Sequence, residues 1–263
     1  MKIVAADISK HFLARGRKVL ALDNANLEVQ DGEFLTLLGP SGCGKSTLLQ
    51  IIGGMESPSS GTLRFEGQRS GSGPITTMVW QRYALFPWRS VKDNVAFGCE
   101  VRGMSRARRH ERAQQFIDIV GLKGFESAYP HELSGGMQQR VALARAICND
   151  PDVLLMDEPL AALDAQTRAV MQIELLRIWG QFRKTVVYVT HSIEEAVLLG
   201  DRIAVMTARP GRVKEIIAVP LPRPRTLDML TAPEFHALAD RAWRSIKDEF
   251  DKAYGENSQE ASA

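Results

Sequence analysis

Apolar and polar positions follow two patterns along the chain, and each predicts a different kind of element. Alternating residues and short apolar runs rich in β-branched side chains predict strands, whereas apolar residues three and four positions apart predict helices. We expect strands at 2–9, 21–29, 33–39, 57–67 (after a turn), 75–81, 152–159 and 185–192, a hairpin over 202–219 around Pro210-Gly211, and helices at 45–54, 105–122, 137–147, 165–182 and 193–200.

The order of these elements predicts the class of fold. Strands and helices alternate along most of the chain, which is typical of a mostly parallel sheet covered by helices. From about residue 98 to 150 the pattern is helical, and Ser105 stands where an N-cap is expected, with Gly121 at the end of that helix. Residues 69–74, RSGSGP, are expected to form a flexible loop.

Composition narrows the class of protein. The 263 residues are 44% hydrophobic and 24% charged, with a net charge of +2, so no strong positive field favours nucleic acid. The three cysteines are far apart in sequence and form no CxxC pair, so neither a zinc site nor a disulfide framework is expected, which fits a reducing cytosol. No apolar run approaches the roughly 20 residues that span a bilayer.

One glycine-rich segment predicts a phosphate site. Residues 39–47, GPSGCGKST, match G-x-x-x-x-G-K-[ST] between a predicted strand and a predicted helix. Glycine at 42 and 44 would let backbone N–H groups face phosphate oxygens, Lys45 would reach the β and γ phosphates, and the Ser46 hydroxyl would ligate Mg²⁺. A plain glycine turn is the alternative. The expected ATP-binding residues are Gly39, Pro40, Ser41, Gly42, Cys43, Gly44, Lys45, Ser46 and Thr47.

Two acids follow a buried strand. Four apolar residues, 153–156, place Asp157 at the carboxyl end of its strand, where α/β sheets bind ligands. Asp157 would hold the Mg²⁺ shell, and Glu158 would accept a proton from attacking water. Alone, such a pair is more often a solvated strand end; the phosphate-binding loop upstream favours the functional interpretation.

A second glycine-bearing helix start, HELSGGMQQR at 131–140, lies between these two motifs. The order of three motifs resembles that of the ATP-binding cassette (ABC) ATPases: a phosphate-binding loop, then LSGGMQ at 133–138, then LLMDEP. The resemblance extends over nearly the whole chain. Met137 departs from the commonest form of the family, LSGGQ.

The resemblance implies an α/β fold: a P-loop NTPase with a RecA-like core, an antiparallel β subdomain and an inserted α-helical subdomain. The single domain would span 1–250, the helical subdomain about 88–152, and 251–263 would be a disordered tail. In the family two cassettes pair head to tail. Ser134 and Gly136, with Gly135 and Gln138, would then serve ATP on the partner's P-loop.

Four further residues each match a single position of the family outside these motifs. Gln81, after the strand at 75–81, matches the glutamine that contacts Mg²⁺ and water, although Trp80 replaces the usual phenylalanine. His191 matches the histidine that contacts the γ-phosphate, with a structural histidine as the alternative. Asp164 matches the D-loop. Phe12 matches the aromatic residue that stacks on adenine, with plain core packing as the alternative.

The segment 83–98, YALFPWRSVKDNVAFG, resembles the nitrate, sulfonate and taurine importers, as do RPGRV at 209–213 and 219–225. Phe86, Pro87 and Trp88 would border the groove for a membrane subunit, or simply pack the subdomain junction. The resemblance implies an ATPase on the cytoplasmic face of the cell membrane. Its partners would be a second cassette, a membrane permease and, indirectly, a solute-binding protein, with no nucleic acid. The alternative is a soluble repair or translation factor.

Overall fold

The computed structural model describes the backbone of residues 1–14 and 16–260. By its internal contacts the chain divides into two compact units. The first unit combines residues 1–68 with 185–263, and the second is the continuous segment 69–184. The predicted helical insertion at 88–152 therefore lies inside the second unit.

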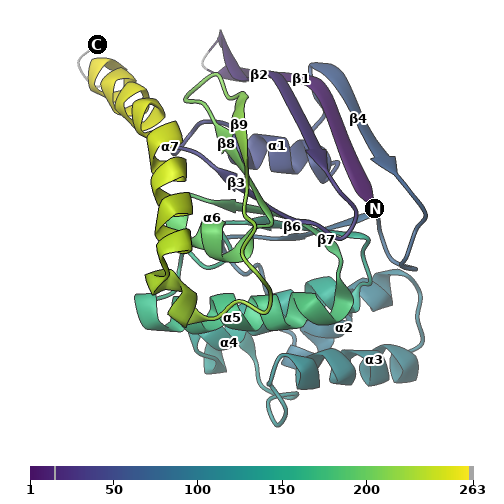
Figure 1. Ribbon diagram of the computed structural model, residues 1–263. Coiled ribbons are helices and arrows are strands. Elements are labelled where there is room, and N and C mark those ends of the chain that lie inside the picture. Colours follow the sequence, from purple (N-terminus) through teal and green to yellow (C-terminus); the bar gives the residue numbers. More distant parts are fainter. Residues whose placement is uncertain (15, 261–263) are drawn as a thin grey trace. The chain divides into compact units, whose positions relative to one another are not determined.

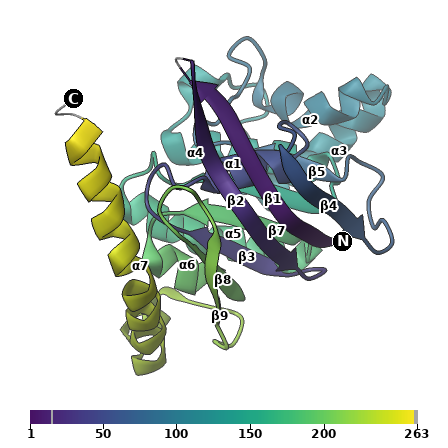
Figure 2. The ribbon, with the colours of Figure 1, turned by 90° about the horizontal axis from the view of Figure 1, so that it is seen from above.

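An antiparallel sheet opens the first unit. Its strands lie in the order β2-β1-β4, and Ile3 on β1 pairs with Val29 on one side and Phe65 on the other (Figure 2). The β1–β2 hairpin is longer than predicted, because its outer part is held by backbone pairing such as His11 with Leu20 rather than by an apolar face. The strands are β1 (Lys2–Ala14), β2 (Arg17–Val29) and β4 (Ser60–Glu66).

Four further strands of the first unit run in the order β7-β3-β8-β9. β3 is parallel to both neighbours and all five of its residues are buried, which explains its continuous apolar run. The elements are β3 (Phe34–Leu38), α1 (Lys45–Ile52), β7 (Thr185–Thr190), α6 (Ile193–Leu199), β8 (Arg202–Met206) and β9 (Val213–Ala218).

The first unit ends in a long helix that the sequence patterns did not predict. After the short 3-10 turn η2 (Leu227–Thr231), α7 (Pro233–Glu260) lies beside α6 and β8 (Figure 1). It buries a narrow stripe, Phe235, Ala242, Ile246 and Glu249. Helix continues to Glu260 where a disordered tail was expected from 251, and residues 261–263 lie outside the described residues.

The second unit is mainly helical. Three of its helices, α2, α3 and α4, contact one another, and β5 pairs in parallel with β6. α2 begins earlier than the expected residue 98, because the Ser90 side chain accepts a hydrogen bond from the backbone of Asp93. Ser105 precedes α3 without a side-chain capping bond. The elements are β5 (Thr76–Val79), α2 (Val91–Val101), α3 (Arg106–Ile119), η1 (Pro130–Glu132), α4 (Gly135–Cys148), β6 (Val153–Asp157) and α5 (Ala165–Phe182).

The loop at 69–74 differs from its prediction. Two carboxylates hold it: Asp152 accepts hydrogen bonds from Arg69, Ser70 and the Gly71 backbone. Asp150 accepts one from the Ser72 backbone at 2.9 Å. The polar composition that suggested flexibility instead supplies the donors for these bonds.

The three cysteines are buried and carry thiols rather than disulfides. Cys99 on α2 and Cys148 on α4, far apart in sequence, bring their sulfur atoms to 3.9 Å. This contact lowers the pKa of Cys99, and the same contact together with burial raises the pKa of Cys148. Among the described residues no helix is long and apolar enough to cross a membrane.

Candidate functional site

The predicted phosphate loop connects β3 to α1 within the first unit. Gly42 and Gly44 have φ of 75° and 103°, in the left-handed region where other residues are strained. Space is a second constraint at Gly44, because a Cβ atom there would lie 2.8 Å from the Leu22 side chain and 2.9 Å from the Ala21 oxygen. Both glycines are therefore required by the path of this loop.

Lys45 occupies the first turn of α1 and is only 5% exposed. Its ammonium group donates hydrogen bonds to the backbone oxygens of Gly39, at 2.8 Å, and Pro40, at 2.9 Å. Two neutral carbonyls compensate a buried positive charge only in part. An anionic phosphate beside the N-terminus of α1 would compensate it better, so this loop fits the charge of a nucleotide.

His191 leaves the sheet at the same edge as the phosphate loop. β3 and β7 are parallel, and Leu38 pairs with Thr190, so Gly39 and His191 each directly follow paired residues. The Thr190 hydroxyl donates to Glu195 at 2.6 Å and accepts from the Ser192 backbone at 3.0 Å, which fixes the turn. The fold thus places His191 at the sheet edge where the phosphate loop begins.

The second unit places three predicted residues at one sheet edge by the same kind of parallel pairing. They are Gln81, Asp157 and Glu158. β5 and β6 are parallel and their last pair is Val79 with Met156, so Asp157, at the end of β6, and the other two residues all come just after this pair. Glu158 has a φ of 43°, a left-handed conformation that costs a non-glycine residue about 1–3 kcal/mol. Such strain concentrates at functional positions, which supports a role for Glu158 beyond ending a strand.

The signature segment forms the start of α4 in the second unit. Ser134 is its N-cap and accepts a hydrogen bond from the Met137 backbone at 3.3 Å. Gly136 faces α5 so closely that a Cβ atom would lie 3.0 Å from the Thr167 methyl. The Gln138 amide is turned back to the backbone oxygens of Pro130 and Leu133, at 3.0 and 3.2 Å, so here it holds the segment before the helix.

Asp164 caps α5 by accepting a hydrogen bond from the Thr167 backbone at 3.0 Å. This bond lowers the pKa of Asp164 below its ordinary value. A cavity of about 410 Å³ is lined by residues from the starts of both helices. The motif search did not identify several residues that line this cavity, because the lining comes from two separate segments of the chain. It is lined by Ser134, Gly136, Met137, Arg140, Gln166, Thr167, Val170 and Met171.

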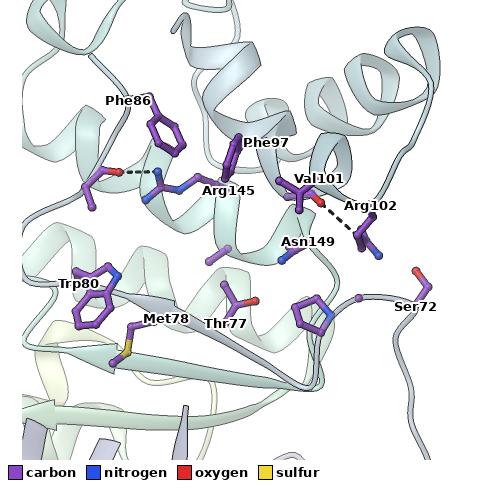
Figure 3. A pocket seen from close by; sticks show the side chains of 15 residues that line it. Ser72, Thr77, Met78, Trp80, Phe86, Phe97, Val101, Arg102, Arg145 and Asn149 are labelled. Atoms are coloured by element: carbon purple, nitrogen blue, oxygen red, sulfur yellow. Dashed lines mark hydrogen bonds between the residues drawn. The ribbon is translucent and has the colours of Figure 1, made fainter. Parts of the chain in front are cut away.

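A larger groove of about 660 Å³ lies elsewhere in the second unit, and Figure 3 shows its lining. Trp80, Met78 and Phe86 supply apolar surface. Arg145 donates hydrogen bonds to the backbone oxygens of Ala84, at 2.7 Å, and Tyr83, at 2.9 Å, and burial lowers its pKa. The groove is therefore largely apolar, with the half-buried guanidinium of Arg145 fixed at its wall and the exposed Arg102 also lining it.

The segment before α2 carries three of the predicted residues. Phe86 lines the groove and packs on Phe97, with ring centroids 4.5 Å apart. Trp88 is 71% exposed, so the alternative that it packs the subdomain junction is wrong for this residue. An exposed tryptophan beside an apolar groove is typical of a surface that another protein covers.

Phe12 lies on β1 and is half-buried, with the Lys10 ammonium 5.0 Å from its ring centroid. The ring is therefore not enclosed as a core residue would be. The phosphate loop, His191 and Phe12 belong to the first unit, whereas Gln81, the two acids, the signature and Asp164 belong to the second.

Comparison with known proteins agrees with this geometry. The family model described as ABC transporter matches residues 22–161. The chain is 52% identical over 250 residues to an uncharacterised ABC transporter ATP-binding protein of Methanocaldococcus jannaschii, covering 95% of this chain and 92% of that protein. It is 42% identical to a nitrate import ATP-binding protein of Synechocystis, covering 91% and 93%. It is 41% identical to an aliphatic sulfonates import ATP-binding protein of Bacillus subtilis, covering 98% and 99%.

Solved structures support the fold. A dimeric ATP-binding cassette in a post-hydrolysis state, bound to ADP and phosphate, superposes with a TM-score of 0.72 at 31% identity, covering 84% of this chain and all of that one. The predicted fold class is confirmed. By family match, identity and structure, the chain belongs to the ABC transporter family as an ATP-hydrolysing, ATP-binding subunit.

Proposed function

We propose that the chain powers a bacterial importer of nitrate, a sulfonate, taurine or a similar small solute. The class of solute rests on the segment 83–98 and on similarity to nitrate and sulfonate import proteins. The observation that carries the transport role is the apolar groove beside Gln81, with Trp88 exposed next to it. A membrane subunit would dock there, on the cytoplasmic face of the membrane.

The residues of the phosphate loop would hold the triphosphate. Lys45 would exchange its two carbonyl partners for phosphate oxygens, and the N–H groups of the loop would add neutral donors. Phe12 would stack on the adenine, because its ring is accessible on β1. His191 would contact the γ-phosphate, because it follows β7 at the loop's edge.

The donor set fits Mg²⁺, which prefers oxygen ligands and shares them with phosphates. Ser46, Gln81 and Asp157 would supply these ligands, and the ion would neutralise phosphate charge. Glu158 would accept a proton from the attacking water as that water adds to the γ-phosphate. Its left-handed backbone conformation supports a functional role at this position.

Two chains would pair head to tail, with the signature of each serving the ATP of the other. Ser134 and Gly136 line the 410 Å³ cavity on the second unit, where the N–H groups at the start of α4 and the Ser134 hydroxyl would donate to an incoming phosphate. Asp164 starts the helix on the opposite wall. A periplasmic or lipid-anchored solute-binding protein would reach this assembly only through the permease.

Co-expression with the permease encoded nearest in the genome tests this function. The complex should be retained on membranes and, in proteoliposomes with its solute-binding protein, should hydrolyse ATP faster when the correct solute is added. Val101→Arg, at a groove residue that is 69% exposed, should abolish retention without unfolding the chain. Phe125→Arg, on exposed surface away from the groove, is the matched control. Retention of Val101→Arg at the control level would refute docking in this groove.

A further inference from the structure

The RPGRV segment singled out in the sequence forms a closed turn, residues 207–212, between β8 and β9. The Thr207 backbone donates to the Arg212 oxygen at 2.9 Å. The Thr207 hydroxyl donates to the Pro210 oxygen at 3.0 Å and accepts from the Arg212 backbone at 2.9 Å. Three bonds within six residues make this turn a firm element rather than a loose loop.

The turn is bonded to β2 and lies against the phosphate loop, all within the first unit. Gly211 donates to the Ala21 oxygen at 2.9 Å and accepts from the Asp23 backbone at 3.0 Å. Arg212 pairs with the Asp23 carboxylate. Gly211 also touches the loop itself, because a Cβ atom at this position would collide with the Cys43 oxygen.

Arg209 contacts the loop one residue earlier. Its guanidinium donates to the Gly42 oxygen at 3.4 Å, a long bond made by an otherwise exposed side chain. The turn therefore lies against two successive carbonyls, those of Gly42 and Cys43.

The orientation of those carbonyls decides what the loop can bind. In a planar trans peptide the N–H points away from the C=O, so holding the oxygens of Gly42 and Cys43 outward turns the N–H groups of Cys43 and Gly44 inward. Inward N–H groups are the donors of a phosphate loop. The Cys43 N–H has the Pro40 oxygen as acceptor at 3.4 Å, a long bond that a phosphate oxygen can replace.

The other end of the turn is anchored to α7. Glu249, only 3% exposed, accepts a hydrogen bond from the Ala208 backbone at 3.0 Å. Lys214 and Lys252 donate to the same carboxylate at 2.8 and 3.2 Å. A chain of contacts thus runs from the C-terminal helix through residue 208 to the phosphate loop.

We propose that the turn 207–212 is a brace that holds the phosphate loop in its nucleotide-binding shape, with Arg209 and Glu249 as positioning residues. The proposal rests on the proposed role of this loop in ATP binding. The brace touches no reacting atom, so its loss should weaken nucleotide binding and leave turnover at saturating ATP unchanged.

The first test is titration of the purified full chain with ATP and Mg²⁺. Arg209→Gln should raise Kd and KM about three- to tenfold, the size expected for one long, solvent-exposed hydrogen bond, with kcat unchanged. Arg209→Lys, which keeps a cationic donor, should recover part of the affinity. Arg64→Gln, at an exposed arginine on β4 of the same unit, should bind ATP as the wild type does.

Two further readouts separate positioning from general stability. Amide exchange at Cys43 and Gly44 in the nucleotide-free chain should change in Arg209→Gln. Glu249→Met, which removes the acceptor for Ala208, should also raise Kd. Combined with Arg209→Gln it should raise Kd less than the product of the two separate effects, because both act on one brace.

The outcomes separate the two proposals. Failure of the wild type to bind ATP would overturn the proposed function. Wild-type binding with an unchanged Kd in Arg209→Gln would overturn the brace alone. A fall in kcat equal to the fall in affinity would also overturn the brace. The same holds if Arg209→Lys recovers none of the affinity that Arg209→Gln loses.

Discussion

Asn94 is predicted to determine the shape of the groove wall. Its side chain is fully buried and accepts a hydrogen bond from the Phe86 backbone at 2.9 Å, and its two amide N–H groups are shared among the oxygens of Phe86, Arg89 and Ser90 at 3.0–3.1 Å. Asn94→Ala removes the accepted bond and both donors, and leaves the Phe86 N–H without its acceptor. At about 0.5–1.5 kcal/mol for each of three bonds, the free energy of unfolding should fall by roughly 1.5–4.5 kcal/mol.

Urea unfolding followed by tryptophan fluorescence measures this loss, and the two units should be fitted separately if their transitions differ. Amide exchange at Phe86 reports on the segment directly and should accelerate in the variant. Lys92→Ala, on the same helix, controls for helix propensity and should change stability by less than about 0.5 kcal/mol.

A loss below about 1 kcal/mol in Asn94→Ala would refute the reasoning, because the bonds together would then contribute no more than one ordinary hydrogen bond. An unchanged amide exchange rate at Phe86 would also refute the reasoning, since other contacts would then hold this segment.

Three further predictions test other parts of the molecule. Glu158→Gln should bind ATP and form a stable dimer on a sizing column without turnover, because an amide cannot take a proton; hydrolysis at the wild-type rate would show that Glu158 is not the base. Trp88→Ala should change the free energy of unfolding by less than about 0.5 kcal/mol, because this side chain is 71% exposed, yet should uncouple ATPase activity from transport in proteoliposomes; normal transport would contradict the docking role. Burial alone would raise the pKa of Glu249, but hydrogen bonds from Lys214, the Ala208 backbone and Lys252 hold it below the ordinary 4.5. Its ionised form therefore stabilises the chain above pH 4.5, and this contribution disappears as pH falls through the lower folded value, so the stability difference between wild type and Glu249→Gln should shrink in acid; a difference independent of pH would contradict this assignment.

The sequence located those features whose signal is local. The phosphate loop, the acids at the end of β6 and the signature are each predicted from a segment of ten residues or fewer, and Gly42, Gly44 and Glu158 all have positive φ. Buried parallel strands were equally visible, because burial on both faces leaves a continuous apolar run such as β3.

Features that depend on distant partners were missed. α7 buries only a narrow stripe, one member of which is the charged Glu249, so its pattern resembled a polar segment. The loop at 69–74 looked flexible because its acceptors, Asp150 and Asp152, lie some eighty residues away. Arg209 likewise reaches Gly42 only through the fold.

The central claim is that the signature of one chain completes the ATP site of another, and mixing two inactive variants tests it most directly. Ser134→Arg blocks the signature and Lys45→Ala disables the phosphate loop. If the signature acts on the neighbouring chain, a mixed dimer has one site with both lesions and one with neither.

Phosphate release should therefore reappear when the two variants are combined, although neither is active alone, and should rise with the fraction of mixed dimers measured by native mass spectrometry. If each signature instead served its own chain, every site in the mixture would carry one lesion. Mixed dimers present in quantity without any phosphate release would contradict the account.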